Sequence, residues 1–274
     1  MSDPTDQIPE TTVEVDPATA PRERDIRLPL ATRVDGSMTR DVTLRRTTGW
    51  EEDLLRDESG GDKARMERVS QVLSQCTVKI GTKVRTGDIG DNHKEDQTFF
   101  FDEYQKMSTP SRAFAWVKLR QLSHGHIFSF GATCSSCKKH NDGIKVNLLE
   151  LVVTEATDEF CSSDTHVYEA DGHMAEWKVV AGEDEFKMQK LRKDNPGNME
   201  SAELFPFLVK LDGKKPNSLV DLLSLSSEFR SGLRDQFSVG GMDLVATNSC
   251  RFCGREFQTL LPIFNKSFFS PGGK

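Results

Sequence analysis

Two short cysteine pairs decide how this chain folds: Cys134-Ser-Ser-Cys137 in the middle of the sequence and Cys250-Arg-Phe-Cys253-Gly254 near its end. With two residues between the cysteines, one tight turn can present both sulfurs to a metal ion. The glycine directly after Cys253 suits a turn that needs a positive φ. Because tetrahedral Zn²⁺ takes four soft ligands, we predict that Cys134, Cys137, Cys250 and Cys253 bind one Zn²⁺ ion.

The distance between the pairs along the chain is unusual. A compact zinc ribbon separates its cysteine pairs by about 15 to 20 residues, whereas 112 residues, Lys138 to Ser249, lie between them here. The prediction is therefore a split ribbon in which two distant hairpins share an ion. Four cysteines close the coordination sphere, so we expect a structural site. Two alternatives stay open: the pairs could be ordinary buried thiols, or His140 could replace one thiolate, although this histidine fits a solvated loop better.

Composition predicts a soluble chain that folds in the cytoplasm. The chain has 274 residues, a net charge of −7 and a hydrophobic fraction of 36%, and it has no run of the roughly 20 apolar residues that span a membrane. Met1–Ala20 has neither the basic nor the apolar region of a secretory signal. In a cytoplasmic chain the six cysteines are expected to be metal-bound or free rather than disulfide-bonded. The acidic balance argues against a nucleic-acid partner, although a local basic patch could override it.

Residues 1–26 differ in composition from the rest of the chain. They carry a net charge of −5 and four prolines, with few large apolar groups that could offset the entropy of ordering them. We interpret this segment as an extended arm that either stays disordered or orders along a partner. The remaining residues carry a net charge of only −2, so the body is nearly neutral.

Hydrophobic periodicity predicts several elements before and around the first cysteine pair. A strand is expected over 41–46, with Val42 and Leu44 on one face. Thr48-Gly-Trp-Glu51 matches a capping box and predicts a short helix to about Asp57. The other elements expected here are a helix over 63–76 with Cys76 in the core, a helix that Thr109-Pro110 starts and Gly125 ends, a strand over 126–130 leading into Cys134, and a return strand over 144–148.

The middle of the chain gives weaker signals. Asp171-Gly172 favours a tight turn in a hairpin over 167–180, residues 203–211 form a candidate edge strand because of Pro206, and 218–237 shows helical spacing. We expect an α+β fold with a helical N-terminal region, short antiparallel sheets and a split Cys₄ zinc-ribbon-like module. The expected divisions are the arm 1–26, a strand and helical region 27–125, the first zinc hairpin 126–157, an insertion of strands and a helix 158–238, and the second cysteine pair with a Phe-rich tail 239–274.

No sequence motif indicates catalysis. The common motifs of hydrolases, nucleotide-binding loops and zinc proteases are absent, and acid runs such as Glu183-Asp-Glu185 usually lie on solvated faces. We therefore expect no enzyme activity and no small-molecule substrate. Phe99-Phe100-Phe101, Phe264, Phe268 and Phe269 admit two interpretations: local packing, or docking into neighbouring subunits.

Three stretches of the sequence, taken in order, are similar to one protein family. They are Asp41–Leu55 with a helix ending at Val72–Cys76, then Lys118–Gly125 with Cys134–Cys137, and finally Cys250–Gly254 with Leu261-Pro262 and Phe268-Phe269. In this order they resemble the baseplate hub subunits of contractile-tailed bacteriophages, over most of residues 28–270 and most weakly in the middle.

The resemblance implies a structural protein of the virion tail baseplate, assembled in the host cytoplasm. In that position the chain would join spike, hub, tube and wedge proteins through protein contacts in a multi-copy assembly. Two alternatives accompany it. One is a baseplate assembly factor absent from the mature particle, and the other is a zinc-ribbon protein that binds nucleic acid through Lys138, Lys139 and Lys145.

Overall fold

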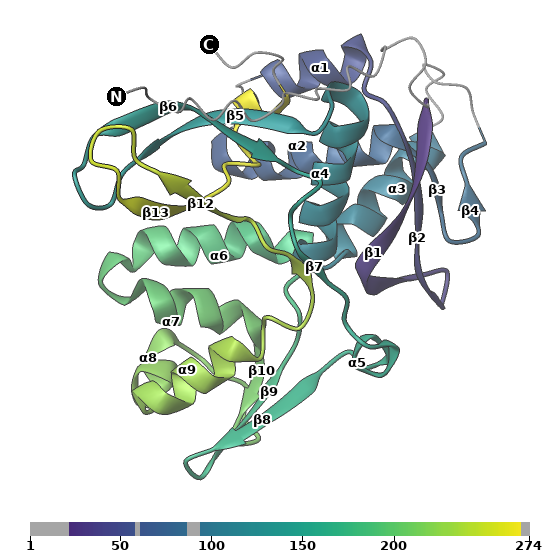
Figure 1. Ribbon diagram of the computed structural model, residues 1–274. Helices are drawn as coiled ribbons and strands as arrows, with labels where there is room; N and C mark the ends of the chain where they lie inside the picture. Colours follow the sequence, from purple (N-terminus) through teal and green to yellow (C-terminus); the bar gives the residue numbers. More distant parts are fainter. Residues whose placement is uncertain (1–21, 58–60, 87–93, 270–274) are drawn as a thin grey trace.

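A four-stranded antiparallel sheet opens the fold. The computed structural model describes residues 22–57, 61–86 and 94–269 (Figure 1). The sheet has the order β1-β2-β3-β4 and consists of β1 (Glu23–Val34), β2 (Ser37–Arg45), β3 (Thr77–Ile80) and β4 (Lys83–Val84). The predicted strand over 41–46 is confirmed as part of β2. β1 was not predicted. Because it begins at Glu23, residues 23–26 belong to this strand and not to the arm expected over 1–26. Residues 1–21 lie outside the described part.

Four helices pack against one another, and the last of them also packs against the sheet. They are α1 (Gly49–Arg56), α2 (Gly61–Cys76), α3 (Lys94–Lys106) and α4 (Thr109–His124). The predicted helices α1, α2 and α4 are confirmed, whereas α3 was not predicted. The predicted cap of α4 is one residue off, because Ser108 is the N-cap and Thr109 already belongs to the helix. α4 is buried from Ser111 to Val117 and again over most of its last turns, which makes it the central helix.

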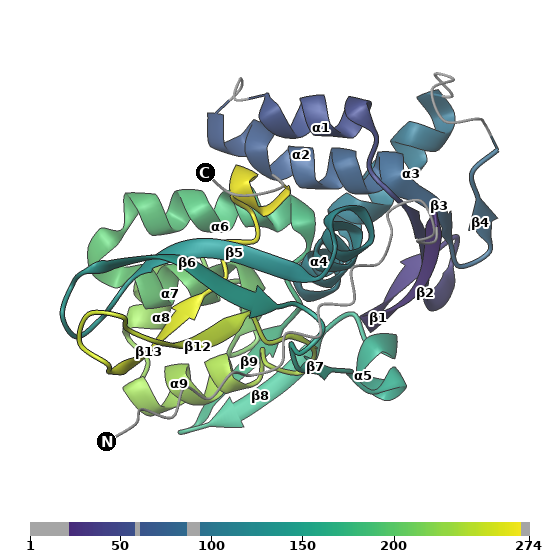
Figure 2. The same ribbon diagram turned by 45° about the horizontal axis from the view of Figure 1, so that its top comes forward.

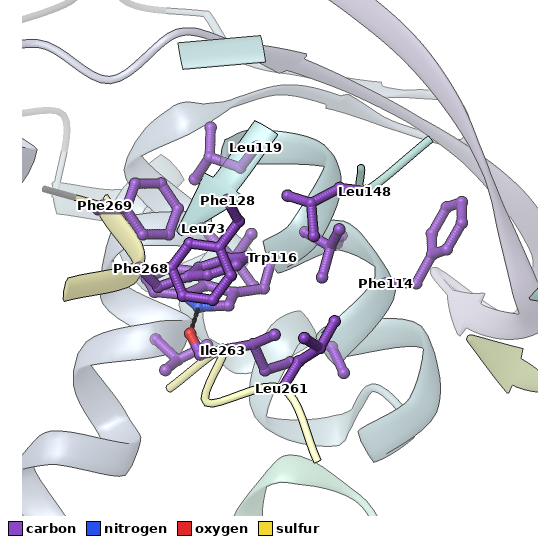
Figure 3. Packing of buried hydrophobic residues seen from close by; sticks show 14 of the residues in the cluster. Leu73, Phe114, Trp116, Leu119, Phe128, Leu148, Leu261, Ile263, Phe268 and Phe269 are labelled. Atoms are coloured by element: carbon purple, nitrogen blue, oxygen red, sulfur yellow. Dashed lines mark hydrogen bonds between the residues drawn. The ribbon is translucent and has the colours of Figure 1, made fainter. Parts of the chain in front are cut away.

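The C-terminal tail packs onto α4, which favours one of the two interpretations of its phenylalanines. Phe268 and Phe269 are buried with Phe128 and Trp116 (Figure 3), and the Trp116 Nε1–H donates to the carbonyl of Ile263 over 2.8 Å. Phe100 is also fully buried. Local packing therefore explains these phenylalanines, and only Phe264 of the set is exposed.

Two hairpins carry the cysteine pairs. β5 (Ile127–Thr133) pairs with β6 (His140–Asn147), and β12 (Val245–Ser249) pairs with β13 (Glu256–Leu260). The two hairpins lie side by side although they are far apart in the sequence (Figure 2). β7 (Val153–Thr154) pairs with β11 (Gly241–Met242), so residues 155–240 leave and return at one place.

Residues 155–240 form a unit with its own small core. Its elements are α5 (Asp158–Ser162), β8 (His166–Ala170), β9 (His173–Trp177), α6 (Gly182–Asp194), α7 (Met199–Leu204), β10 (Leu208–Leu211), α8 (Leu219–Leu223) and α9 (Ser227–Asp235). Trp177, Leu222 and Phe229 are among the buried residues of a cluster separate from the main one. The predicted β8–β9 hairpin is confirmed, with positive φ at Asp171 and Gly172.

Two predictions in this unit were wrong in detail. Residues 203–207 complete α7 and a 3₁₀ turn, so only Leu208–Leu211 is a strand, at the edge of the sheet as Pro206 suggested. The helix predicted over 218–237 is broken into α8 and α9 because Ser218 and Ser226 each cap a helix start.

The α+β class with short antiparallel sheets is confirmed. Within the described ranges, no helix combines the length and apolar character needed to cross a bilayer.

Candidate metal centre

The four cysteines predicted as metal ligands converge at one point. Their sulfur atoms all lie within 4.8 Å of one another, with 3.9 Å between the Cys134 and Cys253 sulfurs and 3.6 Å between those of Cys137 and Cys250. These separations are far longer than the roughly 2.05 Å of a disulfide, and all four thiols are free. The sulfurs are thus placed to ligate a single metal ion.

The two cysteine turns, Cys134–Cys137 (the first knuckle) and Cys250–Cys253 (the second knuckle), share one backbone pattern. In the first, Lys138 N–H donates to the carbonyl of Cys134 and Cys134 N–H donates to that of Lys139. In the second, Gly254 and Cys250 make the corresponding bonds to the carbonyls of Cys250 and Arg255. Each hairpin therefore closes its turn in the same way and aims two sulfurs inward.

The residue after each second cysteine has a left-handed backbone. Gly254 has φ +69°, as the sequence predicted, and Lys138 occupies the equivalent position with φ +61°. A lysine pays a steric penalty there that glycine avoids. The repeat of this conformation on a non-glycine residue shows that the knuckle geometry, and not the residue type, imposes it.

Backbone N–H groups donate hydrogen bonds to three of the cysteine sulfurs. Those of Cys137 and Ser136 point at the Cys134 sulfur and lower the pKa of its thiol. Desolvation raises the pKa of the Cys250 thiol, but donors from Phe252, Cys253 and Asn141 outweigh it and bring the pKa to about 6. At Cys253 an Arg255 donor lowers the pKa, yet desolvation and the neighbouring thiols raise it to about 11. The lowered pKa values of Cys134 and Cys250 favour their thiolate forms, which are the forms that bind a cation.

Asn141 joins the two knuckles and was missed by sequence reasoning. It is 3% exposed; its side-chain oxygen accepts from Arg251 N–H over 3.0 Å and its amide donates to the carbonyl of Lys139 over 3.1 Å. A buried amide that satisfies backbone groups on both hairpins fixes their relative position. The only sequence signal for Asn141 is that it is a polar residue in a segment expected to be a loop.

His140 does not join the cluster. Its side chain is exposed and lies 3.1 Å from Asp142 and 3.2 Å from the Thr133 hydroxyl. Cys134 and Cys250 are buried, Cys137 is partly buried and Cys253 is exposed. An ion held by these four sulfurs would therefore have its ligand sphere filled by protein, with one ligand at the surface.

The remaining cysteines and the acid run have other positions. Cys76 is fully buried in the main core, and the Cys161 sulfur accepts from Ala31 N–H over 3.3 Å. Glu183-Asp-Glu185 is not a solvated face, because Asp184 and Glu185 are buried. Glu185 accepts from the buried Arg112 guanidinium, so it belongs to an ion pair rather than to a pair of catalytic carboxylates.

The lysines suggested for nucleic-acid binding are exposed. Lys139 lies over the ring of Phe252, with 5.0 Å from its Nζ to the ring centroid, and Arg251 lies over the same ring at 4.8 Å. The sequence did not single out Phe252 or Arg251, which stand between two cysteines and look like spacer residues. No protein-family model matches the chain, and searches of curated proteins and of solved structures found no similar protein.

Proposed function

We propose that this chain is a structural subunit of the baseplate hub of a contractile phage tail, stabilised by one structural Zn²⁺ ion. The observation that carries the structural role is the convergence of four sulfurs from two cysteine pairs that 112 residues separate in the sequence. The place in the baseplate rests on the resemblance of Asp41–Leu55, Lys118–Gly125 and Cys250–Gly254 to that family.

Zinc is the metal that suits the site best. A tetrahedron with Zn–S bonds of about 2.3 Å has its sulfurs about 3.8 Å apart. Two of the sulfur pairs lie at 3.6 and 3.9 Å, and all four sulfurs lie within 4.8 Å of one another. Four thiolates also select zinc or an iron–sulfur centre over hard cations such as magnesium. The residues Cys134, Cys137, Cys250 and Cys253 would hold the ion.

The proposed role is non-enzymatic. Four sulfurs leave no open coordination position for a water or a substrate, so the ion would tie the hairpins together and perform no chemistry. The ion would fix both hairpins against α4 and the C-terminal tail, which share one hydrophobic cluster with Cys134 and Cys250. The rigid body that results would present surfaces to hub, tube and wedge proteins in several copies per particle.

Mass spectrometry of purified virions and of isolated baseplates tests this proposal. We expect the chain in both samples, in multiple copies per particle. Its presence in assembly intermediates but not in virions would establish an assembly factor instead. Its absence from virions, baseplates and intermediates alike would contradict both assignments.

Nucleic-acid binding is the second candidate, and one observation favours it. Lys139 and Arg251 lie over the exposed ring of Phe252, and Lys138 and Arg255 are exposed next to the same two cysteine turns. Cations beside an aromatic ring can bind phosphates and stack bases. Electrophoretic mobility shifts with single-stranded and duplex DNA and RNA at low salt test it. Salt-dependent binding lost in Phe252→Ala would support this function, and no shift at low salt would exclude it.

A further inference from the structure

The surface of the two knuckles combines positive charge with an exposed aromatic ring. We call Lys138, Lys139, Arg251, Phe252 and Arg255 the knuckle surface. All five are exposed, and Phe252 keeps 48% of its surface open to solvent. Phenylalanine and arginine side chains are enriched at protein interfaces relative to the rest of the surface.

Acidic neighbours neutralise only part of this charge. Asp142 lies 3.6 Å from the Arg251 guanidinium and is shared with His140, and Glu256 is exposed beside Arg255. In the described residues, Lys139 is placed against a ring and not against a carboxylate. Four thiolates with one Zn²⁺ would carry a charge of −2, which these cations also offset, but that role does not require an exposed phenylalanine.

The chain itself contains a segment with complementary chemistry. Residues 1–21 hold five acidic residues and no lysine or arginine. Within them Thr11-Thr-Val-Glu-Val-Asp16 alternates β-branched residues with acids, a pattern that favours an extended strand with carboxylates on one side and valines on the other.

The arm also has the right length to reach the knuckle surface. The arm joins the described fold at Arg22, whose carbonyl accepts a hydrogen bond from Arg46 N–H. The next residue, Thr47, donates its N–H to the hydroxyl of Ser123 near the end of α4, so the arm begins close to that end of the helix. β5 starts three residues after α4 and runs seven residues towards the first knuckle, a length of about 24 Å. Extended chain advances about 3.3 Å per residue, so Asp16 to Glu10 would lie about 20 to 40 Å from Arg22.

We propose that the knuckle surface binds the acidic arm of the same chain, with Glu10, Glu14 and Asp16 opposite its lysines and arginines and with Val13 or Val15 against Phe252. A tether of this length keeps the arm at millimolar effective concentration, which favours the chain's own arm over a second copy. The inference goes beyond the structural role and does not depend on a place in the baseplate, because it concerns the isolated chain.

Zero-length crosslinking of the full-length, metal-loaded protein tests this proposal. A carbodiimide joins a carboxylate to a lysine amine only when the two are in contact, and trypsin releases the arm as the single peptide Met1–Arg22 because it contains no earlier cleavage site. We expect this peptide to be linked to Lys138 or Lys139. In an equal mixture of ¹⁴N- and ¹⁵N-labelled protein, the linked pairs should carry the same label.

Matched variants separate docking from random contact. Arg251→Glu with Arg255→Glu keeps both reactive lysines, and we expect severalfold fewer crosslinks at unchanged zinc content. The same double change at two exposed cations elsewhere, Lys214→Glu with Lys215→Glu, should leave the yield unchanged. Raising the salt from about 0.05 to about 0.5 M should also lower the yield, because exposed charges are screened.

Three results would overturn the inference. They are an absence of links to Lys138 and Lys139, a yield that Arg251→Glu with Arg255→Glu does not change, and linked pairs that carry mixed labels, which would assign the arm to a second copy. A docked arm must compete with single-stranded RNA for the knuckle surface. Equally tight RNA binding by the native protein and by the triple variant Glu10→Gln, Glu14→Gln and Asp16→Asn would therefore also overturn the inference. None of these results affects the mass spectrometry of virions and baseplates, so either proposal can be contradicted without the other.

Discussion

Lys138 and Gly254 occupy equivalent positions with a left-handed backbone, which gives a prediction at the scale of one residue. A Cβ at Gly254 would meet no atom within 4 Å, so Gly254→Ala costs only backbone strain, about 1 kcal/mol. Lys138→Gly removes the same strain, so we expect its stability to be unchanged or to rise by up to about 1 kcal/mol. Urea unfolding measures both; an equal loss in the two variants would show that the Lys138 side chain matters more than its backbone.

The buried pair of Arg112 and Glu185 gives a second prediction at this scale. Arg112 is 1% exposed, donates to Ser70 over 2.7 Å and also donates to Glu185. Burial raises the pKa of Glu185 and lowers that of Arg112, each against the opposing effect of its partner. Removal of one partner leaves an uncompensated polar group in the core.

We expect Arg112→Met alone or Glu185→Met alone to cost about 3 to 5 kcal/mol of stability, and the double variant to cost clearly less than the sum. A double-mutant cycle by urea unfolding measures the coupling. Additive losses would contradict a direct interaction between the two side chains. Lys187→Met, which changes an exposed partner of Asp184 on the same helix, is the control and should be nearly neutral.

Among the elements, α1 is held by one buried carboxylate. Glu51 is 2% exposed; it accepts from Thr48 N–H over 2.7 Å, as the predicted capping box requires, and from Arg45 over 2.7 Å. Desolvation raises its pKa, but these donors prevail and hold the pKa below its ordinary value of 4.5. Since a lowered pKa favours the ionised folded form, its contribution is present above that value and is lost as the pH falls through the folded pKa.

Glu51→Gln should therefore lower stability at pH 7 by about 2 kcal/mol and weaken the fall in stability below pH 4.5, the ordinary pKa of this carboxyl. Urea unfolding at a series of pH values gives the profile. The control is Glu52→Gln, whose carboxylate makes a 3.7 Å pair with the exposed Arg56 and should change little. Identical pH profiles for wild type and Glu51→Gln would be inconsistent with this role.

The elements differ in how well the sequence predicts them, and the reasons are physical. α1, α2 and α4 have caps or a one-sided apolar pattern, and Asp171-Gly172 specifies a tight turn, so local chemistry was sufficient. α3 and α6 are rich in charge, and Ala181 gives α6 no side-chain cap; tertiary contacts such as Arg112 with Glu185 stabilise α6. The break between α8 and α9 depends on two serines that apolar spacing alone does not reveal.

Over the whole molecule, the pairing of β7 with β11 explains how distant cysteines meet. The strands at Val153–Thr154 and Gly241–Met242 bring the two ends of residues 155–240 together, so the two hairpins become neighbours although a long segment lies between their cysteines. The sequence predicted which four cysteines meet. It could not predict Asn141 or the burial of the C-terminal phenylalanines, because both depend on contacts that form only when both hairpins are in place.

Loss of the metal should loosen the two hairpins more than the rest of the molecule. We expect Cys134→Ser to abolish stoichiometric metal binding and to lower the amide-exchange protection of β5, β6, β12 and β13, while β8 and β9, whose core is separate, retain theirs. Hydrogen-exchange mass spectrometry measures this. Cys161→Ser changes a free thiol outside the cluster and should keep full protection; equal exchange in all three proteins would argue against a structural metal.

The most direct measurement is X-ray absorption at the zinc edge on freshly purified protein, together with metal analysis. We predict one zinc per chain, bound by four sulfurs at about 2.3 Å with no nitrogen or oxygen ligand. We also predict the same spectrum for Cys161→Ser and loss of stoichiometric zinc in Cys253→Ser. Less than about half an equivalent of zinc, or a first shell that includes nitrogen or oxygen, would contradict it.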